Sequence, residues 1–543
     1  MVVMTPSTHP LLSPELQERY RSSGLWQDSN LMQILADKAR QAPDAPLYLG
    51  DDPKTYAEVA DHARRFASFL RDRGVGPGQT VVAPLVSGWE ATAVVAATSS
   101  VGAQLAPLPS RVSRAQVLGL IHATHAAVLV ISGRVLANGD WKETLNDLKD
   151  NGTSLREVVL TDGQYAPSWA ADLPRLSAVS DDFEPADVNQ TDTGAPFLLL
   201  STGGTTGPSK VVMHAENAVV YAATHYSHRS EMSPQDRILS AGPFGHASGT
   251  VFTLYAPIIA GAAVLPIARW DAEQVSTDVH RHGVTWCLLS GTHIYDLLQL
   301  GDECTSMWSS VRGLSAGSGS DERYIAAEER FGIRIRRMYG LTECMGHALM
   351  PANAPDEVRM ARDGLPFDGT ECFIDGDGET GEYLVRGPSL MLGYLDRPDL
   401  TAEAVTPEGF LHTGDLMSID DNGFVRYVGR LKDVIRRGGI NIDPLELERI
   451  LVQHADVNDV TVVGMPHPRL GEQAVAVIVP RPGAEPGLAG LTALLAERDV
   501  PRQSYPEQVV IVDDLPKTEF GKHNKTMVKR MLAEYETASE ADR

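Results

Sequence analysis

The first two-thirds of the chain alternate short apolar runs with longer segments of mixed apolar and polar residues. The apolar runs at 81–86 and 127–131 are typical of buried strands. The segments at 89–99 and 113–122, which lie between these runs, fit helices. This alternation predicts an α/β fold with layered, largely parallel sheets.

One helix start is marked with particular clarity. Thr55-Tyr56-Ala57-Glu58 has the form of a capping box, in which the side chains at its two ends satisfy each other's backbone N–H groups. Apolar residues then follow on one face at helical spacing over 59–70. We therefore expect a helix to begin directly after Thr55.

The pattern changes near residue 430 and predicts a second, smaller domain. Asp443 followed by Pro444 marks a helix start, because Pro fits the first helical turn. Strands are expected at 460–463, 474–479 and 509–512, and a Pro/Gly-rich loop at 480–490. The predicted organisation is a large N-terminal domain over residues 1–431 and a small α+β domain over 432–543.

Composition excludes several classes of function. The chain has 543 residues, 43% of them hydrophobic and 22% charged, which is typical of a soluble protein of two or more domains. Its formal net charge of −24 argues against a broad basic face for nucleic acid. No segment approaches the length of a membrane span and residues 1–10 do not look like a leader, so we expect a cytoplasmic protein. The cysteines fit reduced core thiols, because no two of them form a CxxC pair: Cys287, Cys304, Cys344 and Cys372.

The most informative segment is 201–210, which reads Ser-Thr-Gly-Gly-Thr-Thr-Gly-Pro-Ser-Lys after the apolar run 197–200. Its glycines allow the backbone to approach a ligand, its threonines supply hydroxyls and Lys210 supplies a cation. Such a set of donors suits a polyphosphate, although a plain polar turn after a strand remains the alternative. It is not a Walker-type loop, because Lys210 follows Ser209 and precedes Val211.

Further candidate residues follow in order along the chain. They are His246 in a run of small residues, Thr342 and Glu343 after Tyr339, Asp415 in a Thr-Gly-Asp segment that we expect to be a turn, Arg430, Lys432 and Lys522. Each has an ordinary structural reading when taken alone: a satisfied core His, a turn Asp or a solvated surface Lys. Only their joint order is specific.

That order resembles the acyl-adenylating superfamily of acyl-CoA and aryl-CoA ligases, carrier-loading adenylation enzymes and beetle luciferases. The resemblance runs from about Thr55 to Lys525 and includes the stretches 381–388, 393–394 and 437–442. It implies a reaction in two halves, in which a carboxylate attacks ATP to give an acyl-adenylate and a thiol then displaces AMP. It also implies that the small C-terminal domain is mobile and swings about a hinge at Lys432 between the two halves.

The resemblance assigns roles by position. The β- and γ-phosphates of ATP would be held by Thr205, Thr206, Gly207 and Lys210, and the same loop would bind the cofactor through Thr202, Gly203 and Gly204. Thr342 would contact the α-phosphate, and Glu343 would hold Mg²⁺, which prefers carboxylate and phosphate oxygens. The adenosine would contact Ala316, Gly317, Ser318, Tyr339, Gly340, Asp415 and Arg430. Lys522 would reach in from the small domain and stabilise charge between the attacking carboxylate and the α-phosphate.

The same resemblance outlines a small, mostly apolar acid pocket, formed by His246, Ala247, Gly249, Ser315, Gly340, Met345 and Gly346. Amino-acid-activating relatives carry an Asp directly after the position of His246, where this chain has Ala247. An α-amino acid is therefore disfavoured, because its buried ammonium would have no partner. An aryl or medium-sized acyl acid fits the pocket better, and His246 would gate the pocket or steer the carboxylate.

The thiol acceptor and several rival functions stay open. No carrier domain follows Lys522, so we expect the acceptor to be CoA or a separate carrier protein, with CoA preferred. Some relatives transfer to amines and a few activate nitrite. A catalytically dead homologue is disfavoured, because Glu343, Asp415 and Lys522 are all present. A metal-dependent hydrolase is also disfavoured, because neither histidine pair has a third ligand nearby: His122 with His125, and His280 with His282.

Overall fold

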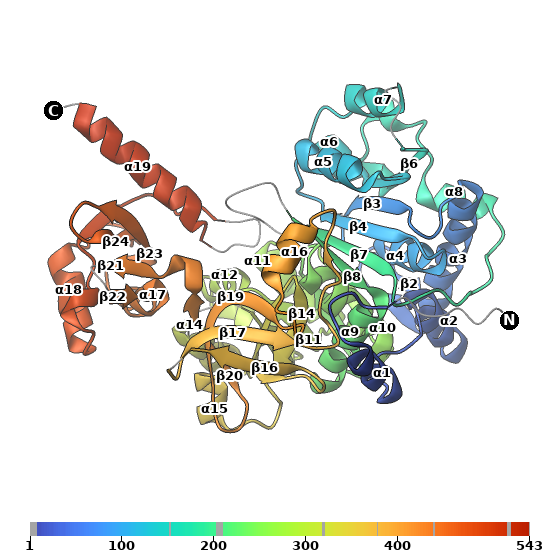
Figure 1. The fold of residues 1–543 in the computed structure, drawn as a ribbon. Coiled ribbons are helices and arrows are strands. Elements are labelled where there is room, and N and C mark those ends of the chain that lie inside the picture. Colours follow the sequence, from blue (N-terminus) through green and yellow to red (C-terminus); the bar gives the residue numbers. More distant parts are fainter. Residues whose placement is uncertain are drawn as a thin grey trace. The chain divides into compact units, whose positions relative to one another are not determined.

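The computed structural model describes residues 8–150, 154–201, 210–317, 321–376, 378–437, 440–517 and 523–541. Its contacts divide the chain into two compact units, and Figure 1 labels many of their elements. Unit 1 comprises Met1–Thr202, Lys210–Glu371 and Val385–Leu411, and the described part of unit 2 comes from Cys372–Leu384 and His412–Arg543. The predicted boundary between residues 431 and 432 stays a prediction, because compactness does not test which part of the chain moves.

Unit 1 contains a sheet whose central strands are parallel and buried. β3 pairs in parallel with β4 and β5, while β8 pairs antiparallel with β7 and β18. The runs at 81–86 and 127–131 form β3 and β5 as predicted, since strands covered on both faces are apolar throughout. The strand order is β18 (Gly393–Tyr394), β8 (Val211–Ala215), β7 (Pro196–Ser201), β4 (Gln104–Pro109), β3 (Thr80–Leu85), β5 (Val128–Ser132) and β6 (Glu157–Thr161).

Helices cover both faces of this sheet (Figure 1). The predicted capping box is confirmed, because Thr55 Oγ1 accepts from Glu58 N at 3.2 Å and Thr55 N donates to Glu58 Oε2 at 2.7 Å. The helices of this part are α1 (Pro14–Ser22), α2 (Leu31–Gln41), α3 (Tyr56–Asp72), α4 (Trp89–Ser100), α5 (Arg114–Thr124), α6 (Gly133–Ala137), α7 (Lys142–Asp150) and α8 (Leu176–Asp182).

A second sheet of unit 1 carries several of the candidate active-site residues. It runs in the order β15 (Leu365–Pro366), β14 (Cys344–Leu349), β13 (Ile335–Leu341), β12 (Gly313–Ala316), β11 (Trp286–Leu289), β9 (Arg237–Ser240), β10 (Ala263–Pro266), β1 (Pro46–Tyr48) and β2 (Lys54–Thr55). The remaining helices of unit 1 are α9 (Glu216–Arg229), the π-helix η3 (Ser248–Tyr255), α10 (Ala256–Ala260), α11 (Ala272–His282), α12 (Gly291–Leu298), α13 (Glu303–Met307), α14 (Asp321–Phe331), α15 (Asp356–Ala361) and α16 (Pro398–Ala404). Strands β9 to β13 are parallel where they pair, so their carboxyl ends meet at one edge.

Unit 2 contains most of a small sheet in the order β16 (Glu371–Asp375), β17 (Gly381–Arg386), β19 (Leu411–Ile419) and β20 (Val425–Arg430). Its other sheet is built from β21 (Ile435–Arg437), β22 (Ile440–Ile442), β23 (Val457–His467), β24 (Gly471–Pro480) and β25 (Gln508–Ile511). Helices α17 (Pro444–Leu451), α18 (Leu488–Glu497) and α19 (Lys525–Ala541) complete the α+β unit.

The predicted helix start of unit 2 is confirmed, and two other expectations are corrected. Asp443 caps α17, and its Oδ1 accepts from Leu445 N at 2.9 Å. The predicted loop 480–490 ends early, because α18 begins at Leu488. The Thr-Gly-Asp segment at 413–415 is not a turn but part of β19, where Asp415 pairs with Arg430 of β20.

Candidate active site

The hairpin of β13 and β14 presents Thr342 and Glu343 at its tip. Leu341 lies opposite Cys344 in the antiparallel register, so the two residues between them form the whole turn. The sequence therefore places a hydroxyl and a carboxylate next to each other at the carboxyl end of β13. Ligands commonly bind at the carboxyl ends of the strands in α/β sheets.

Three contacts from other elements hold this turn. His214 Nε2 lies 2.7 Å from Thr342 O, and since a carbonyl only accepts, the ring donates from Nε2. Burial lowers the pKa of His214 to about 4, so the ring is neutral at pH 7. Met391 N donates to Glu343 O at 2.8 Å, and Tyr394 Oη donates to Glu343 Oε1 at 2.9 Å. The turn is thus oriented from outside its own hairpin.

Lys210 lies close to this arrangement. Its Nζ is 4.7 Å from the centre of the Tyr394 ring, within the range of a cation–π contact. Lys210 directly precedes β8, and β8 also carries His214. The cation predicted to bind phosphate and the carboxylate predicted to bind Mg²⁺ therefore contact the same tyrosine. The rest of the predicted phosphate loop lies outside the described residues: Thr202, Gly203, Gly204, Thr205, Thr206 and Gly207.

The residues predicted to contact adenine lie at neighbouring strand ends. Ala316 ends β12, which is parallel to β13 and places Ala316 opposite Arg337. Tyr339 on β13 is 8% exposed, and its ring meets the edge of His347 at 5.3 Å between centroids. Gly317 follows Ala316 and is half-buried, whereas Ser318 lies outside the described residues. The described members of this set are close in the fold, and their contact with a nucleotide stays a prediction.

His246 lies just before the π-helix. Ser248 N donates to His246 Nδ1 at 3.2 Å, and the Ser248 hydroxyl lies 2.8 Å from the same nitrogen. Because Nδ1 accepts, the neutral ring carries its proton on Nε2. Thr253 closes the first turns of this helix, since its hydroxyl donates to Ser248 O and Gly249 O, both at 3.1 Å. A π-helix is rare and is frequent at functional sites.

Glycines bring the π-helix and the hairpin into close contact. A Cβ on Gly346 would lie 2.2 Å from Phe252 Cζ, and one on Gly340 would lie 2.4 Å from Gly346 Cα. A Cβ on Gly249 would lie 2.2 Å from Pro243 O. The structure therefore brings these predicted pocket residues to one place. Ala247 is half-buried at the start of the π-helix, and Ser315 and Met345 are fully buried.

Unit 2 carries a second group of predicted residues. Arg430 Nε donates to Asp415 Oδ1 at 2.8 Å, and Asp415 is 5% exposed. Thr413 supports this acid, because its hydroxyl accepts from Asp415 N at 3.1 Å and donates to Tyr383 O at 2.7 Å. The expected neighbourhood of Asp415 and Arg430 is thus confirmed, while their contact with ribose stays a prediction. Lys432 is exposed in the short helix Leu431–Asp433, and its role as a hinge is untested.

Lys522 lies outside the described residues, but its neighbours in sequence are placed. Lys517 and His523 pair across an isolated antiparallel bridge. Both side chains reach Asp459 Oδ2, from Lys517 Nζ at 3.4 Å and from His523 Nε2 at 3.1 Å. One carboxylate therefore joins the two sides of the segment that contains Lys522.

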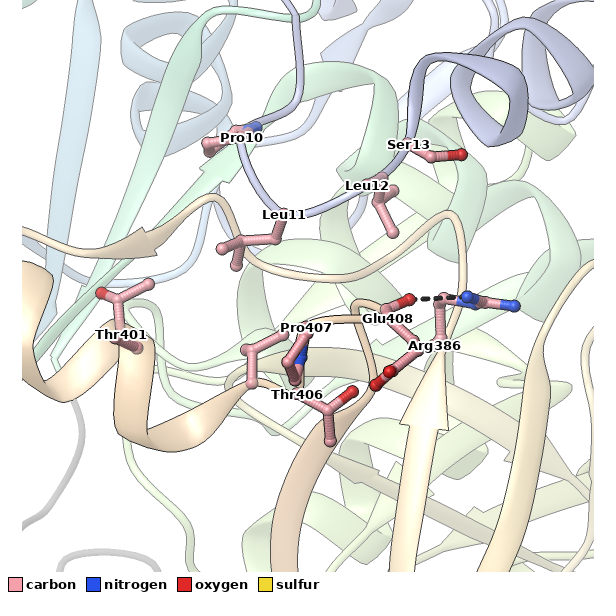
Figure 2. A pocket seen from close by; sticks show the side chains of 11 residues that line it. Pro10, Leu11, Leu12, Ser13, Arg386, Thr401, Thr406, Pro407 and Glu408 are labelled. Carbon is pink, nitrogen blue, oxygen red and sulfur yellow. Dashed lines mark hydrogen bonds between the residues drawn. The ribbon is translucent and has the colours of Figure 1, made fainter.

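A cavity of about 480 Å³ opens elsewhere on unit 1, between the N-terminal segment and the stretch around Thr406 (Figure 2). Arg386 on its wall donates to Glu408 O at 2.6 Å and also pairs with Glu371. The cavity contains none of the predicted site residues. Its lining comes from residues 10–13, 401–402 and 405–408 together with Arg386.

The rival metal site gains no support from the described residues. They contain no group of three or more His, Cys, Asp or Glu side chains that is arranged to hold a metal ion. None of the four cysteines forms a disulfide in the described part of the chain, and three of them are buried, as expected for core thiols. In the described ranges, no helix is both long and apolar enough to cross a membrane.

Comparison with known proteins gives a consistent result. The family model of AMP-binding enzymes matches residues 35–395, and that of the AMP-binding enzyme C-terminal domain matches residues 446–522. A medium-chain fatty-acid–CoA ligase of Escherichia coli (strain K12) is 28% identical over 523 residues, covering 94% of this chain and 92% of that protein. A salicyl-AMP ligase / salicyl-S-ArCP synthetase of Mycobacterium tuberculosis is 31% identical over 552 residues, again covering 94% and 92%.

Among solved structures, ATP-bound MatB from Rhodopseudomonas palustris matches with a TM-score of 0.82 at 23% identity. The match covers 93% of this chain and 99% of that one, and it confirms the predicted fold class. The chain belongs to the family of AMP-binding enzymes. It is an AMP-forming acid–thiol ligase, which activates an acid with ATP as an adenylate and passes it to a thiol.

Two residues of the site were missed by sequence reasoning. The sequence analysis does not single out His214, and only the fold brings it to Thr342. Tyr394 belongs to the Gly-Tyr pair that supports the family resemblance, yet nothing local in the sequence links it to Glu343. Both sit on paired strands, since Tyr394 of β18 lies opposite Val212 of β8.

Proposed function

We propose that this enzyme activates an aryl or medium-sized acyl acid with Mg²⁺ and ATP, and that CoA is the thiol acceptor. The observation that supports the proposal is that Lys210 and Glu343 contact the same tyrosine. Lys210 lies over the ring of Tyr394, and Glu343 accepts a hydrogen bond from its hydroxyl. A cation for phosphate and a carboxylate for a metal are needed together, because an anionic acid must approach a polyanion.

The donor chemistry of the hairpin tip fits Mg²⁺. Glu343 offers carboxylate oxygens, which are hard ligands, and the hydrogen bond from Tyr394 occupies only Oε1. When bound, the cation would neutralise charge on the phosphates. Glu343 is the residue that would hold it, with phosphate oxygens completing the site.

The chain's own residues then account for the first half-reaction. Lys210 would bind the β- and γ-phosphates, and the Thr342 hydroxyl would contact the α-phosphate. His246 would orient the acid carboxylate through Nε2, because its Nδ1 faces the N–H and the hydroxyl of Ser248. Lys522 would offset the charge that develops between carboxylate and α-phosphate, and Asp415 would hold the ribose.

The acid is restricted by the pocket residues. Ala247 offers no charge to an ammonium, which disfavours α-amino acids. The close packing of Gly340, Gly346 and Phe252 limits the space beside the hairpin, which favours a flat or slender acyl group over a bulky one.

A second candidate keeps the same first half and changes the acceptor. The Mycobacterium tuberculosis relative, which is named as a synthetase of salicyl-S-ArCP, supports transfer to a separate carrier protein. Transfer to an amine, and activation of nitrite in place of a carboxylic acid, are the other variants of this chemistry.

The test is acid-dependent exchange of labelled pyrophosphate into ATP, run over aryl, alkyl, cinnamic and amino-substituted acids and nitrite. We expect exchange with an aryl or medium acyl acid, and a loss of about 10²-fold or more in Lys522→Ala. Arg530→Ala is the matched control, because it removes an exposed cation of the same unit that pairs with Glu534. Absence of exchange with every acid, while ATP still binds, would identify a catalytically dead homologue.

The acceptor is settled by a second run with the best acid. Formation of an acyl-CoA at a rate comparable to exchange supports CoA. If exchange occurs but no acyl-CoA forms, and a purified carrier protein is acylated, then the acceptor is the carrier protein and not CoA. ATP-independent hydrolysis that requires zinc would contradict the ligase proposal altogether.

A further inference from the structure

Tyr394 is held rigidly at the point where two strands and the hairpin tip meet. Its strand β18 pairs with β8 through Gly393 opposite Met213, and Tyr394 N donates to Thr401 Oγ1 at 2.9 Å. The side chain is buried, with 6% of the residue exposed. Its ring and hydroxyl therefore have fixed positions before any ligand binds.

The segment before Tyr394, residues 388–391, is also held by hydrogen bonds. Trp26 Nε1 donates to Pro388 O at 2.9 Å, and His9 Nε2 lies 3.2 Å from Leu390 O. Met391 N donates to Glu343 O at 2.8 Å. The N-terminal segment, this stretch and the hairpin tip thus form one connected support.

The hydroxyl of Tyr394 is a donor to a carboxylate. The phenol O–H supplies the proton of this hydrogen bond, because an ionised carboxylate only accepts. Its hydrogen bond to Glu343 Oε1 orients the carboxylate. Within the described residues, Oε2 of Glu343 accepts no hydrogen bond.

The same side chain contacts the cation of the phosphate loop, because Lys210 Nζ lies 4.7 Å from the ring centroid. The Tyr394 ring thus restrains Lys210 while the hydroxyl restrains Glu343. A tyrosine with only a packing role has no need of either charged partner, since a backbone carbonyl would satisfy its hydroxyl equally well.

We propose that Tyr394 is a positioning residue of the adenylation site, whose hydroxyl orients Glu343 for a divalent cation and whose ring positions Lys210 for the phosphates. This inference rests on the proposed function of Glu343 and Lys210. Hydrogen bonds that orient a metal ligand from behind typically change metal affinity when they are lost.

The test uses Tyr394→Phe, which keeps the ring and its contact with Lys210 and removes the hydroxyl. Binding of Mn²⁺ in the presence of ATP is measured by electron paramagnetic resonance on the full-length protein. We expect the Kd for Mn²⁺ to rise by about tenfold. Acid-dependent pyrophosphate exchange should fall by a similar factor, while thioester formation from preformed acyl-adenylate stays within about twofold of the wild type.

The matched control is Tyr56→Phe, which removes another buried hydroxyl of unit 1, one that donates to Ala262 O at 2.9 Å. It should leave Mn²⁺ binding unchanged while altering Tm by a similar amount. The inference is overturned if Tyr394→Phe binds Mn²⁺ with wild-type affinity, or if both variants lower the two half-reactions equally.

The two levels of proposal fail in different ways. A wild-type protein without acid-dependent exchange contradicts the proposed function itself. Wild-type exchange together with unchanged Mn²⁺ affinity in Tyr394→Phe contradicts only the role of Tyr394.

Discussion

Two glutamates of unit 1 occupy contrasting environments. Glu343 lies half-buried at the tip of a hairpin, where one side-chain hydrogen bond from Tyr394 orients it. Glu216 lies at the start of α9, inside a junction of helices, and is 3% exposed. Both are acids of the same unit, yet only the first retains a carboxylate oxygen without a donor among the described residues.

The second carboxylate is satisfied on both oxygens. Glu216 Oε1 accepts from Leu31 N at 2.8 Å, from the Ser99 hydroxyl at 2.8 Å and from the Tyr255 hydroxyl at 3.1 Å. Ser99 also reaches Oε2 at 2.9 Å. These donors join α2, α4 and the end of the π-helix to α9. The difference indicates that a carboxylate available to a ligand, such as that of Glu343, has few hydrogen-bond donors around it. A structural carboxylate, such as that of Glu216, has its oxygens occupied by protein donors.

The largest expected effect comes from removing the charge of Glu343. Glu343→Gln keeps the size of the side chain and should lower acid-dependent pyrophosphate exchange by about 10²-fold or more, because the cation loses its ligand. Its Tm should stay close to the wild-type value, as the turn keeps its backbone contacts to His214 and Met391. Exchange within a few-fold of wild type would contradict the role of Glu343.

Glu216→Ala should have the opposite profile. The change leaves a cavity and strips the N–H of Leu31 and the hydroxyls of Ser99 and Tyr255 of their acceptor. We expect a loss of about 3 kcal/mol or more in the free energy of unfolding, measured with urea. Activity per folded molecule should remain near the wild-type level. A stable Glu216→Ala protein with impaired pyrophosphate exchange would show that Glu216 belongs to the active site. That result would contradict the distinction drawn between Glu216 and Glu343.

The pH dependence of stability sharpens the comparison further. Burial raises the pKa of Glu216 from its ordinary value of 4.5 to about 7. The hydrogen bonds to its carboxylate act in the opposite direction but are outweighed. The folded state therefore binds the proton of Glu216 more tightly than the unfolded state does. The stabilisation that results is fully present below about pH 4.5 and is lost as the pH rises through about 7. It contributes on the order of 3 kcal/mol to the free energy of unfolding. The Tm of the wild type minus that of Glu216→Gln should fall between pH 5 and pH 8. A difference in Tm that is flat over this range would contradict the assigned environment.

The smallest effect is expected from Tyr255→Phe. This variant removes one of the three donors of Glu216 and leaves the packing of the π-helix intact, so it should cost about 1 kcal/mol in the free energy of unfolding. Thermal unfolding checks the value. Phe252→Leu, a neighbouring change without a polar atom, serves as the control for altered packing of the same helix.

Much of the fold followed from local sequence patterns. The capping box at Thr55, the Asp443 cap and the buried strands all formed where apolar spacing and turn chemistry placed them. The Thr-Gly-Asp segment at 413–415 was wrongly expected to be a turn, because pairing of Asp415 with Arg430 in the sheet overrides the local preference of Gly and Asp.

Candidate site residues could be predicted from the sequence only where they belong to a recognisable motif. Thr342, Glu343, Asp415 and Arg430 were predicted from their order along the chain. The structure places Thr342 beside Glu343 and Arg430 beside Asp415, and their contacts with ATP stay predictions. His214 and Tyr394 were missed, because their partners lie 128 and 51 residues away in sequence. Contacts of this kind depend on strand pairing in three dimensions, which no local pattern reports. The roles assigned to Lys432 and Lys522 stay predictions.

Activation through an acyl-adenylate is tested most directly by following oxygen from the acid. With the acid labelled with ¹⁸O in its carboxylate, attack on the α-phosphate followed by thiol displacement leaves one carboxylate oxygen on AMP. Mass spectrometry of the AMP formed with CoA should therefore show one ¹⁸O atom in its phosphate. Unlabelled AMP, with an ¹⁸O atom found in pyrophosphate or inorganic phosphate instead, would contradict this route.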